Sequence, residues 1–476
     1  MLPMRPLPTV LLRLRSLWLV GMCCLLAACA SVRYTPLATI DRVQPEVGYR
    51  LRTAVQSQTA DRARADDLFV VMMFSGGGSR AAALGYGVLK EMRRQQFVRN
   101  GETTDLSAQV DLTFGISGGS MLSAAWALEG PEIFQTFEPH FLKQDIQRNI
   151  VHKVFSVTNW SRLSSPEFGR GDLLEEQLDL TLFRHATFGD LASRRKGPFS
   201  VISATDMSTG SRLDFIQENF DVLCLNLSKL PVARAVAASS AVPLVFAPVT
   251  LNNHGGHCHY TLPEEMQQAL FLTSPGSLEH KTRMEIVRSL TGYDESRQRP
   301  YIHLLDGGLV DNLGMRGLLD ATQLYSSEQI YDQFTLHRAR RIVVLSVNAQ
   351  NRPASVIDQS AAVPPTREVV QALVNIPIDR NSQESLRQFR RLIDHWRAGE
   401  QARARQTGET PVDLYFISLD LADLPDAAQR RQALNIPTSL YLPPAQINLL
   451  EEAGSVLLRQ SSEFQRLQKD LSLTRS

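Results

Sequence analysis

A serine between glycines is the feature of this sequence that most clearly suggests chemistry. Ser117 is the third residue of Gly-Ile-Ser-Gly-Gly, which runs from Gly115 to Gly119 and follows an apolar stretch. In a G-x-S-x-G turn the flanking glycines let the backbone bend sharply, so that the serine oxygen stands clear of its neighbours. A helix that begins at this serine would favour negative charge developing there. The pattern predicts a nucleophile, with Gly115 and Gly119 forming its elbow.

A run of three glycines suggests a partner for that nucleophile. Gly76, Gly77 and Gly78 follow another apolar stretch and lead to Arg80. Consecutive glycines expose backbone N–H groups to an incoming oxyanion without interference from side chains. A dinucleotide-binding loop would need a glycine where Ala81 stands, and the absence of G-K-[ST] excludes a P-loop. We therefore predict an oxyanion hole, with Arg80 adjacent to it.

A carboxylate completes the set of candidate groups. Asp306 precedes two glycines and directly follows the apolar residues 301–305. Active sites of α/β proteins collect at strand ends, and a carboxylate within hydrogen-bond reach can accept a proton from a serine hydroxyl. By itself, Asp-Gly-Gly is more often a simple turn. Its occurrence with the other two motifs favours Asp306 as the base.

These motifs require a sheet that brings strand ends together. Buried strands of parallel sheets are continuous apolar runs, and such runs alternate here with helix-like segments. The alternation predicts an α/β protein with a mainly parallel central sheet. We expect helices mainly at residues 80–94, 121–128, about 130–195, 232–241 and 446–471, and strands at residues 68–74, 110–114, 199–204, 212–216, 301–305, 341–347 and 412–419.

The ordered set GGGSR, GISGG and DGG resembles the patatin-like phospholipase family over residues 68 to about 347, and the segment 235–246 is similar to a further stretch of that family. The resemblance implies a three-layer α/β/α sandwich and hydrolysis of lipid acyl esters, with no metal and no organic cofactor. It assigns Ser117 as nucleophile, Asp306 as base and Gly76, Gly77 and Gly78 as oxyanion hole. The family usually has glycine where Ala81 stands. The lipid could be a phospholipid, a lysolipid, a neutral glyceride or a protein-linked acyl group.

Two other functions are compatible with part of the pattern. An α/β-hydrolase would use a Ser-His-Asp triad, in which His337 or His395 would be essential, but no histidine lies in a motif. The chain could also be an inactive lipoprotein that binds lipid or a partner. The presence of all three motifs argues against this second alternative.

The N-terminus is typical of an exported protein. Arginines precede an apolar run at residues 17–28, which is the layout of a secretory signal peptide. A membrane span needs roughly 20 apolar residues, so this run is too short for one. Leu-Ala-Ala-Cys, ending at Cys29, resembles the lipobox of bacterial lipoproteins. The resemblance implies that the signal peptide is cut off before Cys29 and that Cys29 is lipidated. Ala30 in place of aspartate favours the outer membrane facing the periplasm.

Cysteine and histidine usage adds one expectation and removes another. Beyond Cys29, only Cys224 and Cys258 remain after the signal peptide, and two cysteines in an exported protein suggest a disulfide. The alternative is two buried free thiols. Cys258 also lies among His254, His257 and His259, but no second ligand group accompanies them at finger-like spacing. We therefore predict a disulfide and no metal.

The remaining expectations concern organisation. A formal net charge of +1 gives no support for nucleic-acid binding. Leu386, Phe389, Ile393 and Trp396 form a stripe at helical spacing. Such a stripe could lie on a membrane surface but more often packs on a core. We expect a signal peptide at 1–28, a tether or N-terminal arm at 29–66, a catalytic domain at 67–350 with a helical insertion at 261–300, and a C-terminal extension at 351–476 that packs on it.

Overall fold

The computed structural model describes residues 32–54, 68–99, 101–326, 329–330, 339–352, 357–472 and 474–475. Four expectations lie wholly or partly outside these residues: the signal peptide, the lipidated Cys29, the second part of the tether and a role for His337.

A mainly parallel sheet forms the centre of the protein, as predicted. Its strands follow the order β10-β9-β1-β4-β5-β8-β7, and β6 pairs with β5. The first five strands of this order are parallel to one another, whereas β6, β7 and β8 pair antiparallel. The bounds are β1 Leu68–Phe74, β4 Val110–Gly115, β5 Phe199–Asp206, β6 Arg212–Asp214, β7 Val249–Asn252, β8 Tyr301–Leu305, β9 Arg341–Asn348 and β10 Asp413–Asp420.

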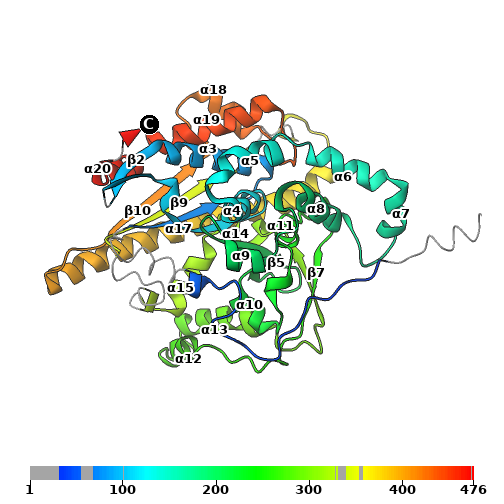
Figure 1. Ribbon diagram of the computed structural model, residues 1–476, viewed down its shortest axis with the longest axis horizontal. Coiled ribbons are helices and arrows are strands. Elements are labelled where there is room, and N and C mark those ends of the chain that lie inside the picture. The colour runs from blue at the N-terminus through cyan, green and yellow to red at the C-terminus, as the bar shows by residue number, and fades with distance from the viewer. Residues whose placement is uncertain are drawn as a thin grey trace, which may run out of the picture.

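Helices cover both faces of this sheet (Figure 1). They are α3 Ser79–Arg94, α4 Gly118–Glu129, α5 Ile133–Phe137, α6 Ile146–Phe155, α7 Val157–Leu163, α8 Arg170–Leu178, α9 Phe188–Arg194, α10 Gln217–Val222, α11 Val232–Ser239, α12 Glu264–Phe271, α13 Leu278–Thr291, α14 Gly308–Asp311, α15 Arg316–Leu324, α17 Thr366–Thr407, α18 Ala427–Leu434, α19 Pro444–Gln460 and α20 Ser462–Asp470. None of the helices formed by the described residues combines the length and the apolar character that crossing a bilayer requires.

Strand β10 shows how the three layers are built. Neighbouring residues of a strand point to opposite faces of its sheet. Phe416 packs against Phe389 of α17, with ring centres 5.0 Å apart, whereas Tyr415 lies under the Arg466 guanidinium of α20. Helices α17 and α20 therefore cover opposite faces, which gives the predicted α/β/α sandwich.

The segment after residue 350 is joined to the same sheet. It contributes the edge strand β10, and its helix α19 packs closely on α3. A Cβ at Gly87 would lie 2.2 Å from the Glu451 carbonyl oxygen, and one at Gly454 would lie 2.5 Å from the Leu84 carbonyl oxygen. Glycine at both positions is what lets the two helices approach this closely.

One predicted helix differs from the structure, and the apolar stripe follows the alternative that was favoured. The single helix predicted over 446–471 is wrong, because the chain leaves the helix at Ser461, whose hydroxyl accepts a hydrogen bond from the Phe464 N–H and starts α20. The stripe that includes Phe389 and Ile393 belongs to the much longer α17. Both side chains are buried, so the stripe packs on the core.

Two further features were not predicted. Strand β7 pairs with β8, and a separate antiparallel sheet joins β2 Gln95–Arg99, β3 Glu102–Asp105 and β11 Thr474–Arg475. These strands are short, and they carry none of the continuous apolar runs that mark the parallel strands. Helices α12 and α13 occupy the segment 261–300, which was expected to be helical.

Candidate active site

Ser117 lies in the turn between β4 and α4. Its φ is 50° and its ψ is −121°, a conformation that residues with a side chain rarely adopt. The surrounding structure enforces this turn, because the Ser117 N–H donates to the Ser239 hydroxyl at 2.8 Å. The Ser239 hydroxyl in turn donates to the Ser203 carbonyl at 2.7 Å. The strained serine is thus fixed by α11 and β5 as well as by its own strand and helix.

The glycines of the elbow are required by close backbone contacts. A Cβ at Gly119 would lie 2.4 Å from the Phe74 carbonyl oxygen, and one at Gly115 would lie 2.7 Å from the Ser120 Cα. At Gly118, a Cβ would lie 2.0 Å from the Gly78 carbonyl oxygen. The elbow therefore accepts no side chain at these positions, and Gly118 allows the glycine loop to touch the nucleophile turn.

Asp306 lies at the same edge of the sheet as Ser117, but the strand that leads to it runs in the opposite direction to the parallel strands. The sequence placed Asp306 at the end of a strand in a mainly parallel sheet, and this strand, β8, pairs antiparallel with β5. Only the last two residues of β8 overlap β5, at its C-terminal end. Strand β8 therefore runs back toward the edge where the parallel strands end. The Asp306 N–H donates to the Ala241 carbonyl at 3.0 Å, and the Asp306 carbonyl accepts from the Thr205 hydroxyl at 2.9 Å.

The serine and the aspartate meet directly. The Ser117 hydroxyl donates to Asp306 Oδ2 at 2.8 Å, and the Gly308 N–H donates to Asp306 Oδ1 at 2.8 Å. Both side chains are buried, with 5% of Ser117 and 6% of Asp306 exposed. Burial raises the pKa of Asp306 to about 6, against the smaller opposing effects of the bonds from Gly308 and Ser117. A carboxylate with that pKa is a stronger base than an ordinary one and is still mostly ionised at neutral pH.

The three glycines of the loop are not equivalent. The Gly76 N–H donates to the Asn312 carbonyl at 3.1 Å. Among the described residues, neither the Gly77 N–H nor the Gly78 N–H has a hydrogen-bond acceptor. Their φ angles of 139° and 59° are in the region that favours glycine. Gly77 and Gly78 are therefore the loop donors available to an oxyanion, and Gly76 fixes the base of the loop.

Arg80 fixes the other end of the loop from the inside of the protein. It is 2% exposed, and it donates to the Ala349 carbonyl at 2.6 Å and to the Ile436 carbonyl at 2.9 Å. Burial lowers its pKa to about 10, so the group remains a cation at neutral pH. The adjacent Ser79 N–H donates to the Ser439 carbonyl at 2.8 Å. The loop is thereby attached to the segment that follows α18.

Sequence reasoning missed two residues of this site. Ser239 binds the nucleophile's backbone, and its only signal was its position in the small-residue segment 235–246. Asn312 holds Gly76 through its carbonyl, and its side-chain oxygen would lie 2.5 Å from a Cβ at Gly76 and 2.9 Å from one at Gly308. It thus lies between the glycine loop and the Asp306 turn. Nothing in the sequence around Asn312 indicated this position.

No histidine of the described residues hydrogen-bonds to Ser117 or Asp306. His303, the nearest to Asp306 in sequence, has Nδ1 3.0 Å from the Thr250 hydroxyl, and His395 is exposed on α17. Cys258 forms the predicted disulfide with Cys224, with Cα atoms 5.5 Å apart. The described residues contain no group of three or more potential ligands placed to hold a metal ion.

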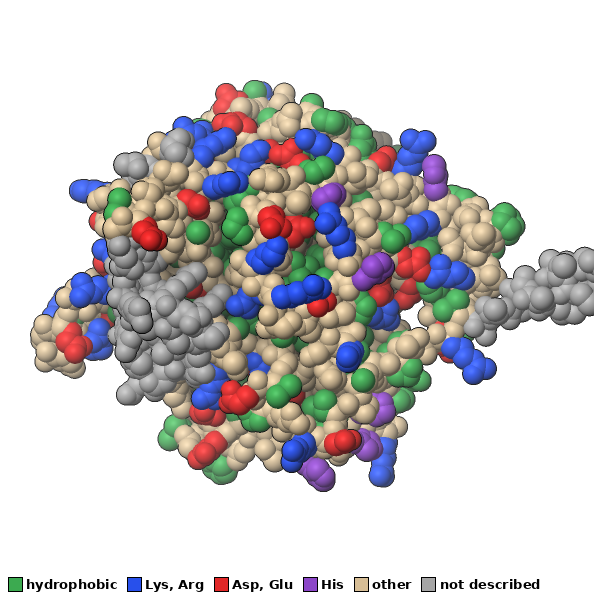
Figure 2. All heavy atoms as spheres, viewed as in Figure 1, with side chains coloured by type: hydrophobic (Ala, Val, Ile, Leu, Met, Phe, Trp, Pro, Cys, Tyr) green, Lys and Arg blue, Asp and Glu red, His purple; other side chains and the backbone are tan. Residues whose placement is uncertain are grey.

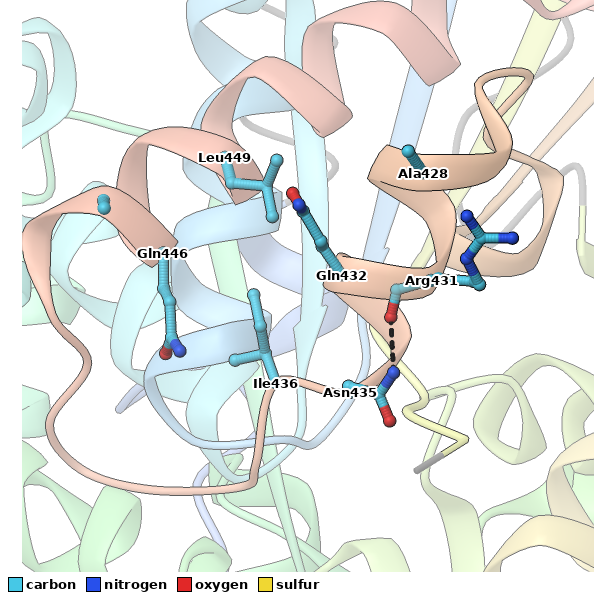
Figure 3. Close-up of a pocket in the computed structure, with 8 residues that line it drawn as sticks. Ala428, Arg431, Gln432, Asn435, Ile436, Gln446 and Leu449 are labelled. Carbon is cyan, nitrogen blue, oxygen red and sulfur yellow. Dashed lines mark hydrogen bonds between the residues drawn. The ribbon is translucent and has the colours of Figure 1, made fainter. Parts of the chain in front are cut away.

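A cavity of about 650 Å³ lies outside the site, between α18 and α19 (Figure 3). Its lining includes Arg431, Gln432, Ile436, Gln446 and Leu449 but neither Ser117 nor Asp306. It approaches the site only through Ile436, whose carbonyl binds Arg80.

Comparison with known proteins gives the geometry a family context. The sequence matches the profile of a family described as patatin-like phospholipase over residues 72–319, more than half of the chain. That range includes Ser117, Asp306 and the glycine loop. No curated protein sequence gives a significant match.

Solved structures with similarity include human GIVD cytosolic phospholipase A2. One is 11% identical with a TM-score of 0.41, over 90% of this chain and 67% of that one. Another, in complex with methyl gamma-linolenyl fluorophosphonate, is 12% identical with a TM-score of 0.38, over 88% of this chain. The present chain covers 63% of the length of that second structure.

Proposed function

The chain belongs to the patatin-like phospholipase family, and from this we propose that it is a lipid acyl hydrolase in which Ser117 and Asp306 act as a catalytic dyad. The observation that carries the proposal is the direct hydrogen bond of 2.8 Å between the Ser117 hydroxyl and Asp306 Oδ2. A serine hydroxyl is a poor nucleophile unless a neighbouring group accepts its proton, and this carboxylate is the group in reach.

In the first step, Asp306 takes the proton as Ser117 Oγ attacks the ester carbonyl carbon. The carbonyl π electrons move to oxygen, which gives a tetrahedral oxyanion. The Gly77 and Gly78 N–H groups, which have no acceptor among the described residues, are the donors we assign to that oxygen. Collapse of the intermediate expels the alcohol, which takes the proton from Asp306, and leaves an acyl-serine.

In the second step, water replaces the alcohol. Asp306 accepts a proton from the water as its oxygen attacks the acyl carbon, and the same N–H groups hold the second oxyanion. Expulsion of Ser117 Oγ, reprotonated by Asp306, releases the fatty acid. The Gly308 N–H bond to Asp306 Oδ1 keeps Oδ2 directed at the serine throughout both steps.

A fluorophosphonate probe tests the nucleophile. It phosphonylates an activated serine, so wild-type protein should be labelled at Ser117 and hydrolyse a soluble fatty-acyl ester. Ser117→Ala should lose both properties, whereas Ser123→Ala, a serine on α4 that is not at the dyad, should keep both. Labelling of the Ser117→Ala variant at the wild-type rate would contradict the proposed nucleophile.

We further propose that residues 1–28 are removed and that Cys29 then carries the lipid anchor of a bacterial envelope lipoprotein. The anchor would lie in the outer membrane, and the protein would face the periplasm. The support is the lipobox-like Leu-Ala-Ala-Cys after a signal-like segment. Wild-type protein should partition into detergent and float with membranes, and Cys29→Ser should do neither or remain unprocessed. Unchanged membrane association of Cys29→Ser would contradict the anchor.

A further inference from the structure

Helices α6 and α7 present an unusually apolar outer surface. Four large apolar side chains lie within ten residues of one another, and their exposed fractions are 46% for Val151, 74% for Phe155, 73% for Val157 and 60% for Trp160. Exposed apolar groups that cluster in this way mark surfaces that meet another molecule or a membrane. We refer to these four side chains as the α6–α7 surface.

The folded core does not use these side chains. Helix α6 buries Ile146 and Ile150, which are one turn apart, and leaves Val151 and Phe155, also one turn apart, on a face toward solvent. The backbone of Ser156 is extended, which ends α6 and begins α7. The exposed residues of α7 thereby continue the apolar surface of α6.

The segment that forms this surface also contains basic residues, of which Lys143 and Arg162 form ion pairs with Glu138 and Glu176. The segment 143–170 has five lysines and arginines against two acidic residues, a net charge of +3 with His152 counted as neutral. The basic residues are Lys143, Arg148, Lys153, Arg162 and Arg170. Figure 2 shows basic and apolar side chains next to each other at the right-hand end of the molecule, where Figure 1 places α6 and α7. Apolar and aromatic groups with basic neighbours are the combination that binds an anionic lipid surface.

The N-terminus enters the fold beside α7. Val32 is the first described residue after the signal-like segment, and its carbonyl accepts a hydrogen bond of 2.8 Å from the Ser165 hydroxyl. Two residues further on, the Tyr34 N–H donates to the Glu167 carboxylate. Cys29 is three residues before Val32, and three residues span at most about 11 Å. An acylated Cys29 would therefore hold α7 close to the bilayer.

We propose that the α6–α7 surface docks on the bilayer that holds the lipidated Cys29, and this proposal rests on the anchor proposed above. The anchor supplies attachment, and the surface fixes the orientation of the protein. Trp160 lies at the level of the lipid headgroups, where tryptophan is favoured, and Phe155 and Val157 enter the acyl region.

Two contacts join residues near this surface in the chain to segments next to the catalytic dyad, one from α6 and one from the first residue of α8. Gln147 of α6 accepts a hydrogen bond of 2.7 Å from the hydroxyl of Ser439, whose carbonyl binds the Ser79 N–H next to Gly78. On the other side, Arg170 donates to the carbonyl of Leu244 at 2.7 Å. Docking therefore sets the position of the glycine loop relative to the membrane.

Leu244, which accepts the bond from Arg170, is another exposed apolar residue. It is 69% exposed and has a φ of 70°, which is strained for a leucine. Three residues earlier, the Ala241 carbonyl accepts the Asp306 N–H. The loop from Ala241 to Leu244 thus runs from the dyad to the membrane-facing side. The substrate class that follows is an acyl ester of a lipid in the anchoring membrane itself.

Tryptophan fluorescence tests the docking. Full-length processed protein would be reconstituted in phosphatidylethanolamine–phosphatidylglycerol vesicles whose acyl chains carry bromine, a short-range quencher. Of the three tryptophans that follow residue 28, Trp126 is 3% exposed and Trp396 packs against the core, so Trp160 should dominate the quenching, and Trp160→Phe should remove most of it. Phe155→Ser/Val157→Ser should abolish most of the quenching. The matched control, Phe271→Ser/Leu272→Ser at the C-terminal end of α12, replaces residues that are 87% and 81% exposed and should leave the quenching unchanged.

Flotation and hydrolysis of the same samples separate the proposals. Phe155→Ser/Val157→Ser should lower the ratio of vesicle hydrolysis to soluble-ester hydrolysis by about tenfold or more, because two apolar side chains no longer leave water. Protein that floats without quenching at Trp160 would overturn the docking and leave the anchor intact. Protein that does not float would overturn both. Loss of soluble-ester hydrolysis in wild-type protein would instead contradict the catalytic proposal.

Discussion

At the scale of single residues, the dyad depends on one hydrogen bond between two buried side chains. Among the described residues, the Ser117 hydroxyl bonds only to Asp306, and the Asp306 carboxylate receives only that hydroxyl and the Gly308 N–H. The essential proton therefore has one acceptor. This arrangement differs from a triad, in which a histidine takes the proton and the aspartate only orients it.

Mutations distinguish the two mechanisms. Asp306→Asn should lower kcat for ester hydrolysis by at least about a thousandfold, nearly as far as Ser117→Ala, and the double variant should be little worse because both residues serve one step. His303→Ala, His337→Ala and His395→Ala should each stay within about threefold of wild type. The measurement is steady-state hydrolysis of a soluble ester, with folding checked by circular dichroism. A histidine variant as inactive as Ser117→Ala, together with an active Asp306→Asn, would establish a triad instead.

The raised pKa of Asp306 predicts a pH profile. The base must be ionised, so kcat/KM should rise with pH through an apparent pKa near 6 and then level off. The effect on stability has the opposite sign. Because the folded state binds this proton more tightly than the unfolded chain, the contribution of Asp306 to folding falls as pH rises from about 4 to about 6. Urea unfolding at both pH values should show a larger fall in wild type than in Asp306→Asn, because other buried carboxyl groups with raised pKa, such as Asp311 and Asp320, contribute to the fall in both proteins. A kcat/KM profile centred near pH 4 would contradict the burial of the base.

At the scale of secondary-structure elements, the site is an assembly of strand ends and a loop that must touch. The nucleophile elbow and the glycine loop come from neighbouring parallel strands, β4 and β1, and they meet where Gly118 faces Gly78. Asp306 comes from β8, which runs in the opposite direction. The position of the active site at this edge of the sheet is therefore set by the contacts between the backbone segments that follow β1, β4 and β8.

Gly118→Ala tests that approach. Its Cβ would lie 2.0 Å from the Gly78 carbonyl oxygen, so the glycine loop must move and its donors with it. Loss of oxyanion donors costs about 100-fold to 1000-fold in kcat, and we expect a decrease of that size. Gly399→Ala is the control, because nothing lies within 4 Å of its Cβ on α17. That variant should keep full activity and gain up to about 1 kcal/mol of stability. An unchanged kcat in Gly118→Ala would contradict the proposal that the glycine loop supplies the oxyanion donors.

The sequence predicted local features of these elements well. Ser117, its flanking glycines and the apolar strands are set by neighbouring residues, and the pattern therefore carries them. The contacts of Arg80 with Ile436 and of Ser117 with Ser239 join residues far apart in the chain, and no local pattern encodes them. The break at Ser461 was missed because a serine in a helix-like segment gives little sign of whether it will cap a new helix. The direction of β8 was missed because the strand has only five residues, too few for its alternation of exposed and buried positions to be recognised as that of an antiparallel strand.

At the scale of the whole molecule, the fold is joined by long-range connections as much as by the sheet. The C-terminal segment supplies β10 and holds Arg80, and the N-terminal segment crosses to β7, where Tyr34 donates to Asn252 at 3.0 Å. The disulfide is a further connection. It joins the end of α10 to the loop that leads into α12 and α13.

That disulfide should stabilise the whole protein without serving catalysis. Cys224 and Cys258 are 34 residues apart, and closing a loop of that size in the unfolded chain is worth about 3–4 kcal/mol in the chain-entropy model. A reductant should therefore lower the urea midpoint of wild-type protein while leaving native-state hydrolysis at Ser117 within about twofold, because neither cysteine contacts the dyad. Cys224→Ser/Cys258→Ser should already have the lower midpoint and should not respond to reductant. If the protein is exported as proposed, mass spectrometry of envelope material should find the two sulfurs linked; two free thiols there would contradict both the bond and the oxidising compartment that the proposed signal peptide implies.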